Sequence, residues 1–189
     1  MIPIRTLTAL ELPRYRDHLL RLDEADRRLR FGFPIADAGI AAFVGGIDPL
    51  DTRLLVHEGP DLEVVGAVQA VATAWQAAEF AFSVEPRSRG RGIATALFDR
   101  AVLWARNRGI RRAYVQCLAE NRAMRQIARK AGMAIVTASG ESEGYLDIPA
   151  ATTATVLREL IEESRGLCAF ADQARGRLAA PFPVVPAAA

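Results

Sequence analysis

Residues 83–98 read SVEPRSRGRGIATALF and mark a change from a strand pattern to a helix pattern. An apolar run stops at Pro86, three arginines follow at alternate positions, a glycine stands after each of the last two, and helical apolar spacing starts at Ile93. Gly90 and Gly92 permit positive φ values and let a bulky group approach the main chain. Free N–H groups and the helix dipole at a helix start both favour an anion. The stretch therefore predicts a strand-to-helix turn that can hold a pyrophosphate.

Other phosphate-binding motifs fit this stretch less well. A P-loop requires a Gly-Lys-Ser/Thr ending, and no lysine lies near. The dinucleotide fingerprint requires Gly or Ala where Thr95 stands, and an acidic residue about 20 positions on, where the chain has Arg111 and Arg112. A plain strand-to-helix turn without a ligand remains the alternative reading of the motif taken alone.

The basic residues are concentrated around this turn. Between Arg87 and Lys130 there are 12 basic and two acidic residues, whereas the rest of the chain has 12 basic and 20 acidic residues. Such asymmetry indicates a polyanionic ligand near the segment, or a set of solvated arginine-rich helix faces. Nucleic acid is a poor candidate for that ligand, because Lys130 is the only lysine and no known binding motif is present.

Composition favours a cytoplasmic protein without a membrane span or a metal. The 189 residues are 51% hydrophobic, enough for one domain with a sizeable core. No apolar run approaches the roughly 20 residues that cross a bilayer, and the N-terminus lacks the plan of a signal peptide. Cys117 and Cys168 form neither a disulfide framework nor a metal cluster, and His18 and His57 have no metal-ligand spacing. We expect both histidines to be structural or exposed.

Hydrophobic periodicity predicts an α/β sandwich on a mixed sheet, not a run of alternating βα units. Three neighbouring strands are spaced closely enough for an antiparallel meander. The predicted strands cover 2–7, 53–57, 64–74, 77–84, 112–118, 135–138 and 145–148, and the predicted helices cover 9–22, 37–44, 92–108, 121–131 and 152–177, the last with a break near Gly166. We expect a domain at 1–149, a C-terminal helical appendage at 150–178 and an extended or flexible tail at 179–189.

A second motif follows the glycine turn at a compatible distance. Arg87-x-x-Gly90-x-Gly92 stands after a strand and before a helix; a further strand leads to Asn121, which opens a helix that ends near Gly132-Met133. In this order the segment 79–133 resembles the acyl-CoA-binding core of the GNAT superfamily of N-acetyltransferases. The resemblance implies a mixed, mostly antiparallel central sheet flanked by helices, here with an added C-terminal helix.

The resemblance also implies acetyl-CoA as the acyl donor, bound without a metal. Coenzyme A carries several negative charges, so the basic segment would have its partner. Main-chain groups of Phe82 and Val84 would pair with pantetheine. The pyrophosphate would be bound by the turn, with help from the Thr95 hydroxyl; the turn residues are Arg89, Gly90, Arg91, Gly92, Ile93 and Ala94. Asn121 would contact the pantetheine arm, and Arg125 would contact the adenosine phosphates.

Acetyl transfer to an amine requires a base for the ammonium group and benefits from an acid for the leaving thiolate. Glu79 in AEFAFSV is our candidate base, because the spacing resembles family members with a glutamate on this strand; a glutamate paired with an arginine is the alternative. The position where the family often has a tyrosine acid holds Ala128. Tyr145 or a water molecule would have to replace it, and we expect Cys117 to be a buried structural residue.

The charged segment 27–31, RRLRF, resembles a part of some bacterial GNAT proteins that include enzymes acting on protein lysines. It predicts Arg30 and Phe31 near the acceptor pocket, with a salt-bridged helix end as the alternative. The function predicted overall is transfer of an acetyl group from acetyl-CoA to a primary amine of a small molecule, a protein lysine or an N-terminus. A catalytically weak acyl-CoA sensor is the alternative. The C-terminal helix is expected to cap the acceptor cleft or to form a homodimer.

Overall fold

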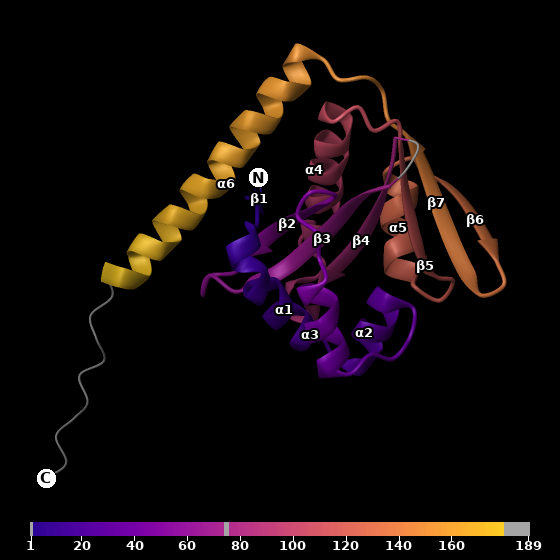
Figure 1. The fold of residues 1–189 in the computed structure, drawn as a ribbon, viewed down its shortest axis with the longest axis horizontal. Helices are drawn as coiled ribbons and strands as arrows, with labels where there is room; N and C mark the ends of the chain where they lie inside the picture. Colours follow the sequence, from indigo (N-terminus) through magenta and orange to yellow (C-terminus); the bar gives the residue numbers. More distant parts are fainter. Residues whose placement is uncertain (1, 74–75, 180–189) are drawn as a thin grey trace, which may run out of the picture.

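A computed structural model describes residues 2–73 and 76–179 of the chain. A seven-stranded sheet in the order β1-β2-β3-β4-β5-β7-β6 has helices on both faces (Figure 1). All neighbouring strands pair antiparallel except β4 and β5, which run parallel. The predicted mixed, mostly antiparallel sheet with flanking helices is therefore confirmed, including the meander formed by β2, β3 and β4.

The elements have the following bounds. The strands are β1 Arg5–Thr6, β2 Thr52–Glu58, β3 Val64–Thr73, β4 Ala77–Val84, β5 Arg112–Leu118, β6 Ala134–Ala138 and β7 Glu141–Asp147. The α-helices are α1 Leu12–Leu20, α2 Glu24–Phe31, α3 Asp37–Gly45, α4 Ile93–Asn107, α5 Arg122–Lys130 and α6 Thr153–Ala179, and short 3-10 helices cover Ala9–Glu11 and Pro86–Ser88.

Two elements differ from the sequence prediction in a way that matters for the site. The charged stretch after α1 forms the separate helix α2, which begins after the N-cap Asp23 and ends at Gly32 with a φ of 84°. β7 begins at Glu141, four residues earlier than predicted, because Ser142 and Gly144 face the interior in alternation with outward polar residues. Small buried residues in a strand carry little hydrophobic signal, so the hydrophobic periodicity did not reveal the first residues of β7.

Each face of the sheet has its own core. The alternation of strand side chains sends Leu55, Val68 and Phe80 toward α4 and α5, and sends Leu54 and Val56 toward α1 and α3. Phe80 and Phe82 pack against Phe98 of α4, with ring centroids 6.1 and 5.8 Å apart. The end of β4 is thereby fixed between a helical layer on each side, which positions the strand that leads into the glycine turn.

The C-terminal helix α6 is continuous through Gly166, where the sequence predicted a break. It packs on β1 and α4 and runs along the side of the molecule away from β6 and β7 (Figure 1). Glu163 accepts a hydrogen bond from the backbone N–H of Thr6 at 2.9 Å, and the Arg5 guanidinium lies 4.2 Å from the Phe170 ring centroid. The helix therefore covers the edge strand β1. The division at residue 149 stays a prediction, and residues 180–189 of the predicted tail lie outside the described residues.

Two glycines of α6 form a matched pair for testing this packing. A Cβ atom at Gly166 would lie 2.3 Å from the Ile4 carbonyl oxygen, whereas one at Gly176 would meet nothing within 4 Å. We expect Gly166→Ala to lower the free energy of unfolding by about 1–3 kcal/mol through overpacking. Gly176→Ala should raise it by about 0.5–1 kcal/mol, because alanine is the better helix former. Urea denaturation measures both, and equal effects of the two substitutions would contradict the docking of α6.

Candidate active site

β4 and β5 diverge after three paired residues. They pair from Ala77 opposite Arg112 to Glu79 opposite Tyr114, and the register extends no further. Beyond Glu79, β4 continues to Val84 with β3 as its strand partner, and β5 continues with β7. Within the described part of the chain, the β4 edge facing β5 therefore has no strand partner from Phe80 onward. Such an edge can hydrogen-bond to the amides of an extended ligand.

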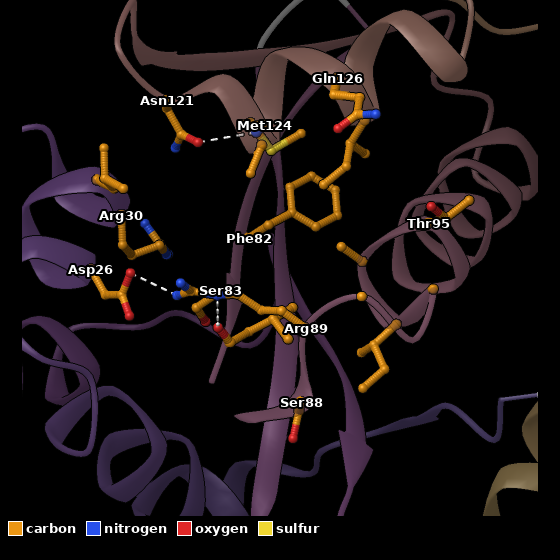
Figure 2. A pocket seen from close by; sticks show the side chains of 18 of the residues that line it. Asp26, Arg30, Phe82, Ser83, Ser88, Arg89, Thr95, Asn121, Met124 and Gln126 are labelled. Atoms are coloured by element: carbon orange, nitrogen blue, oxygen red, sulfur yellow. Dashed lines mark hydrogen bonds and ion pairs between the residues drawn. The ribbon is translucent and has the colours of Figure 1, made fainter. Parts of the chain in front are cut away.

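The diverging ends of β4 and β5 form a fork, and a cavity of about 420 Å³ lies in it (Figure 2). Its walls come from the end of β4, the loop before α4, the first turn of α4, α2 on one side and α5 on the other. Phe82, Ile93, Met124 and Ile127 provide apolar surface. A concave, mostly apolar cavity with a few polar groups is typical of small-molecule and cofactor sites.

The glycine turn forms the anion-binding end of the cavity. Gly90 and Gly92 have φ values of 74° and 82°, and Gly92 is the N-cap of α4 without a side-chain cap hydrogen bond. The first amides of a helix have no intrahelical acceptor. Ile93, Ala94 and Thr95, which carry such amides, line the cavity. The turn therefore offers main-chain donors and the positive end of a helix dipole to a negatively charged group.

Arg89 connects this turn to α2. Its Nε donates to the Val84 carbonyl oxygen at 3.0 Å, and its guanidinium lies 2.6 Å from Asp26 Oδ1 (Figure 2). Asp26 is buried, and its second oxygen, Oδ2, has no hydrogen-bond partner among residues 2–73 and 76–179. Arg89 thus neutralises a buried carboxylate beside the cavity and occupies the last carbonyl group of β4.

Helix α2 places the charged segment 27–31 beside the cavity. Arg30 lines the cavity, and its guanidinium donates to Gln69 Oε1 at 2.7 Å and to the Tyr15 hydroxyl at 3.1 Å. Phe31 instead packs edge-on against Phe43 and is not a lining residue. The sequence prediction named this segment without recognising it as a helix, although the Asp23 cap and the glycine at position 32 signalled both ends.

Asn121 begins the opposite wall. Its Oδ1 accepts a hydrogen bond from the backbone N–H of Met124 at 3.0 Å, which caps α5 (Figure 2). Since the oxygen serves as the cap, the side-chain NH₂ group is the part that can donate to a ligand. Arg125 donates to the Ala119 carbonyl oxygen at 3.0 Å and is not a lining residue.

The structure brings nine of the eleven predicted cofactor residues to the cavity wall: Phe82, Val84, Arg89, Gly90, Gly92, Ile93, Ala94, Thr95 and Asn121. Arg91 and Arg125 are not among the lining residues. The sequence prediction did not include several lining residues, among them Leu22, Asp26, Leu29, Ser83, Ser88, Ala123, Met124, Gln126, Ile127 and Lys130. Most of these lie on helices whose direction toward the fork depends on the tertiary fold.

Glu79 lies at the apex of the fork and is not a lining residue of the cavity. It is opposite Tyr114 on β5, and the Tyr114 pKa is raised, mainly by burial and then by the charge of Glu79. Glu79 and Ser83 share one face of β4, because strand side chains alternate. The predicted base thus stands where the two strands separate.

Ala128 at the family's tyrosine position, the replacement acid Tyr145 and the cysteine expected to be structural, Cys117, all lie away from the cavity lining. Ala128 is buried in α5. Tyr145 is exposed on β7, where its hydroxyl donates to Glu143, and this hydrogen bond raises the Tyr145 pKa. Cys117 is half-buried, and burial raises the pKa of its thiol. None of the three lines the cavity.

Glu85 is a buried carboxylate just after β4 whose charge stabilises the fold. The His18 and Arg21 side chains hold its pKa at about 2, against an ordinary value of 4.5, and Arg21 Nε donates to it at 2.7 Å. A carboxyl group with a lowered pKa contributes stability above its unfolded pKa, and this contribution is lost as the pH falls from about 4.5 to about 2.

We expect Glu85→Gln to lower the free energy of unfolding by about 3 kcal/mol at pH 7 and by much less near pH 2.5. Urea denaturation at both pH values measures the difference. Glu141→Gln, at an exposed position of β7, is the control and should change little at either pH. An equal loss for Glu85→Gln at both pH values would show that its charge does not stabilise the fold.

The sequence profile of the Acetyltransferase (GNAT) family matches residues 13–133, more than half of the chain. No curated protein sequence matches significantly. Among the described residues there is no cluster of three His, Cys, Asp or Glu side chains able to hold a metal, and no described helix is long and apolar enough to cross a membrane.

Several solved structures share the fold. The GNAT domain of Streptomyces lividans PAT is 23% identical, with a TM-score of 0.66 over 76% of this chain and 89% of that one. The Vibrio cholerae spermidine N-acetyltransferase, solved with CoA and spermine, is 16% identical, with a TM-score of 0.62 over 78% and 95%. A Sinorhizobium meliloti phosphinothricin acetyltransferase, solved with AcCoA, is 19% identical, with a TM-score of 0.61 over 81% and 91%.

Proposed function

The chain belongs to the GNAT acetyltransferase family, and on that basis we propose that it transfers an acetyl group from acetyl-CoA to a primary amine. The acceptor amine belongs to a small molecule, a protein lysine or a protein N-terminus. One observation carries the proposal: the edge of β4 that has no strand partner among the described residues and the glycine-capped start of α4 open into the same cavity. An extended amide chain that ends in a pyrophosphate matches both features.

In this proposal the donor follows the cavity from the fork to the turn. Main-chain groups of Phe82 and Val84 pair with the pantetheine amides, and the amides of residues 89–94 bind the pyrophosphate, with the Thr95 hydroxyl beside them. The side-chain NH₂ of Asn121 donates to the pantetheine arm. Arg91 and Arg125 lie outside the lining and attract the adenosine phosphates at the rim.

Glu79 acts as the base that makes the amine nucleophilic. An ammonium group must lose a proton before its nitrogen can attack the thioester carbonyl. Glu79 is an anionic group at the apex of the fork, on the face of β4 that points toward α1 and α2. We place the acceptor on that face, where Asp26 and Arg30 of α2 line the cavity.

A screen for thiol release tests the proposal. The protein is mixed with acetyl-CoA and a panel of amines, and free CoA is measured with a thiol reagent. The panel contains polyamines, phosphinothricin and alanine peptides, after the spermidine, phosphinothricin and ribosomal-protein-S18-alanine acetyltransferases of this fold. Lysine peptides complete it, because a protein lysine is one of the proposed acceptors. We expect release with at least one class, dependent on both substrates.

A catalytically weak acyl-CoA sensor is the second candidate. It is favoured by Ala128 at the position of the family's frequent tyrosine and by the absence of Tyr145 from the residues that line the cavity. Acetyl-CoA binding without thiol release for any amine of the panel would select the sensor. A cytoplasmic location and a homodimer formed through α6, whose Leu157, Leu160 and Ile161 are exposed, stay predictions.

A further inference from the structure

A chain of buried polar groups leads from the cavity wall into the core between β3, β4 and α1. Ser83 lines the cavity, and its Oγ lies 2.8 Å from Nε2 of His18. The other ring nitrogen of His18, Nδ1, lies 2.8 Å from the Val64 carbonyl oxygen and 3.7 Å from Glu85 Oε1. His18 is fully buried, Glu85 is 2% exposed and Ser83 is 8% exposed. Of these hydrogen-bonded residues, Ser83 is the one that lines the cavity.

The hydrogen bonds fix the protonation pattern of the neutral imidazole. A carbonyl oxygen only accepts hydrogen bonds, so Nδ1 of His18 must carry a proton to donate to Val64. Nε2 then has a lone pair, and the Ser83 hydroxyl donates its proton to it. Ser83 Oγ therefore offers a ligand only lone pairs, so it can accept a hydrogen bond from an N–H group in the cavity.

The groups around His18 allow it to take a proton briefly. Glu85, whose pKa is about 2, is a carboxylate at neutral pH and stabilises a positive charge on the ring. Arg21 opposes that charge, because it donates both to Glu85 and to the Val64 carbonyl oxygen, at 2.7 and 2.6 Å. Arg87 lies 3.3 Å from the other oxygen of Glu85, and the Tyr15 ring stacks at 6.4 Å from His18. Because Glu85 favours a positive charge on the His18 ring and Arg21 disfavours it, the ring can accept a proton and then return it.

The reaction proposed above removes two protons from the acceptor nitrogen. An ammonium group and acetyl-CoA give an amide, CoA–SH and one proton in solution. The first proton leaves before attack and reaches Glu79 through water, because Glu79 lies four residues, about 13 Å, from Ser83 along β4. The second leaves the nitrogen after the C–N bond forms, and one proton must reach the sulfur as the C–S bond breaks. The position of the family's tyrosine acid holds Ala128, so this last transfer lacks that acid.

We propose that Ser83 and His18 form a relay that carries this second proton from the nitrogen of the tetrahedral adduct to the sulfur of the leaving CoA. Ser83 Oγ takes the N–H proton while its own proton passes to His18 Nε2. The reverse movement then delivers a proton from Ser83 to the thiolate as the C–S electron pair moves to sulfur. Ser83 is the catalytic residue, and His18 acts through it. The inference rests on the proposed function, because it requires the thioester in this cavity.

An NMR experiment tests the relay without knowledge of the acceptor. The chain has only two histidines, so His57→Gln leaves His18 as the single imidazole in a ¹⁵N-histidine-labelled sample. The free protein should show Nδ1 protonated and Nε2 unprotonated. Coenzyme A should shift the Nε2 resonance, whereas desulfo-CoA, which lacks the sulfur, should shift it much less. In Ser83→Ala the difference between the two ligands should disappear.

Calorimetry with the same two ligands separates failure of the relay from failure of the proposed function. If neither ligand binds, the proposed acetyl-CoA site is wrong, and the proposed relay is overturned as well. If both bind and His18 is unchanged, or responds equally to both, the donor site stands and the relay is overturned. A free protein with Nε2 protonated and Nδ1 unprotonated would also overturn it.

Kinetics on the amine found by the screen provide a second test. Ser83→Ala should lower kcat about 100-fold, the usual size of a general acid–base contribution, and change the KM for acetyl-CoA less than about threefold. Ser83→Thr keeps the hydroxyl and should retain most of the activity. Ser142→Ala is the matched control, because Ser142 is a buried strand serine, on β7, that does not line the cavity. Equal losses in Ser83→Ala and Ser142→Ala would contradict the relay.

Discussion

Replacing Glu79 by glutamine is expected to lower kcat about 100- to 1000-fold while the affinity for acetyl-CoA stays within about twofold of wild type. The substitution keeps the size of the side chain and removes the carboxylate that accepts the ammonium proton. Glu79 lies at the apex of the fork and outside the cavity lining, so a loss of donor affinity is not expected. Thiol release measures kcat, and calorimetry measures the affinity.

The control for this substitution is Glu143→Gln, a second partly buried strand glutamate, on β7, which binds the Tyr145 hydroxyl. It should leave kcat nearly unchanged. Unchanged turnover of Glu79→Gln across its pH range would exclude Glu79 as the base. A parallel loss of acetyl-CoA affinity would instead assign it to donor binding or to the structure of the fork.

Gly90→Ala should weaken acetyl-CoA binding about 10-fold or more. Its φ of 74° is unfavourable for alanine by about 1–2 kcal/mol, and relaxation of that strain would turn the amides of the loop away from the pyrophosphate. A Cβ atom at this position meets no protein atom within 4 Å, so it would project beside the bound phosphate without disturbing the core.

Gly109 provides a matched control for the backbone strain. It has a φ of 73°, a Cβ atom there also meets nothing within 4 Å, and it lies just beyond the far end of α4. Gly109→Ala should cost the same stability as Gly90→Ala and leave acetyl-CoA affinity unchanged. Calorimetry and urea denaturation of both variants separate the two effects. Equal affinities of the two variants would show that the glycine turn does not bind the donor.

The parts of the site that follow from local sequence were predictable. Glycines before an apolar helical pattern specify a turn with free amides, and Asn121 before a second such pattern specifies a cap. Both motifs have the expected backbone form, with positive φ at Gly90 and Gly92 and the Asn121 cap on Met124. The strands β4 and β5 also have the predicted bounds.

The parts that depend on tertiary contacts were not predictable. His18 was expected to be structural or exposed, and its bond to Ser83 joins residues 65 positions apart. Asp26 faces the cavity only because α2 packs beside β4, and the fork itself arises from the point at which β4 and β5 stop pairing. A single sequence carries no signal for such pairings, since periodicity shows which face of an element is buried and not what lies against it.

Titration of the ¹⁵N-labelled protein with acetyl-CoA reports donor binding and its location together. We expect saturable binding at one site, with the largest changes in the amides of residues 89–95 and of β4 beyond Glu79. The amides of α6 should change little. Absence of binding, or changes confined to residues away from the fork between β4 and β5, would show that acetyl-CoA does not bind in this cavity.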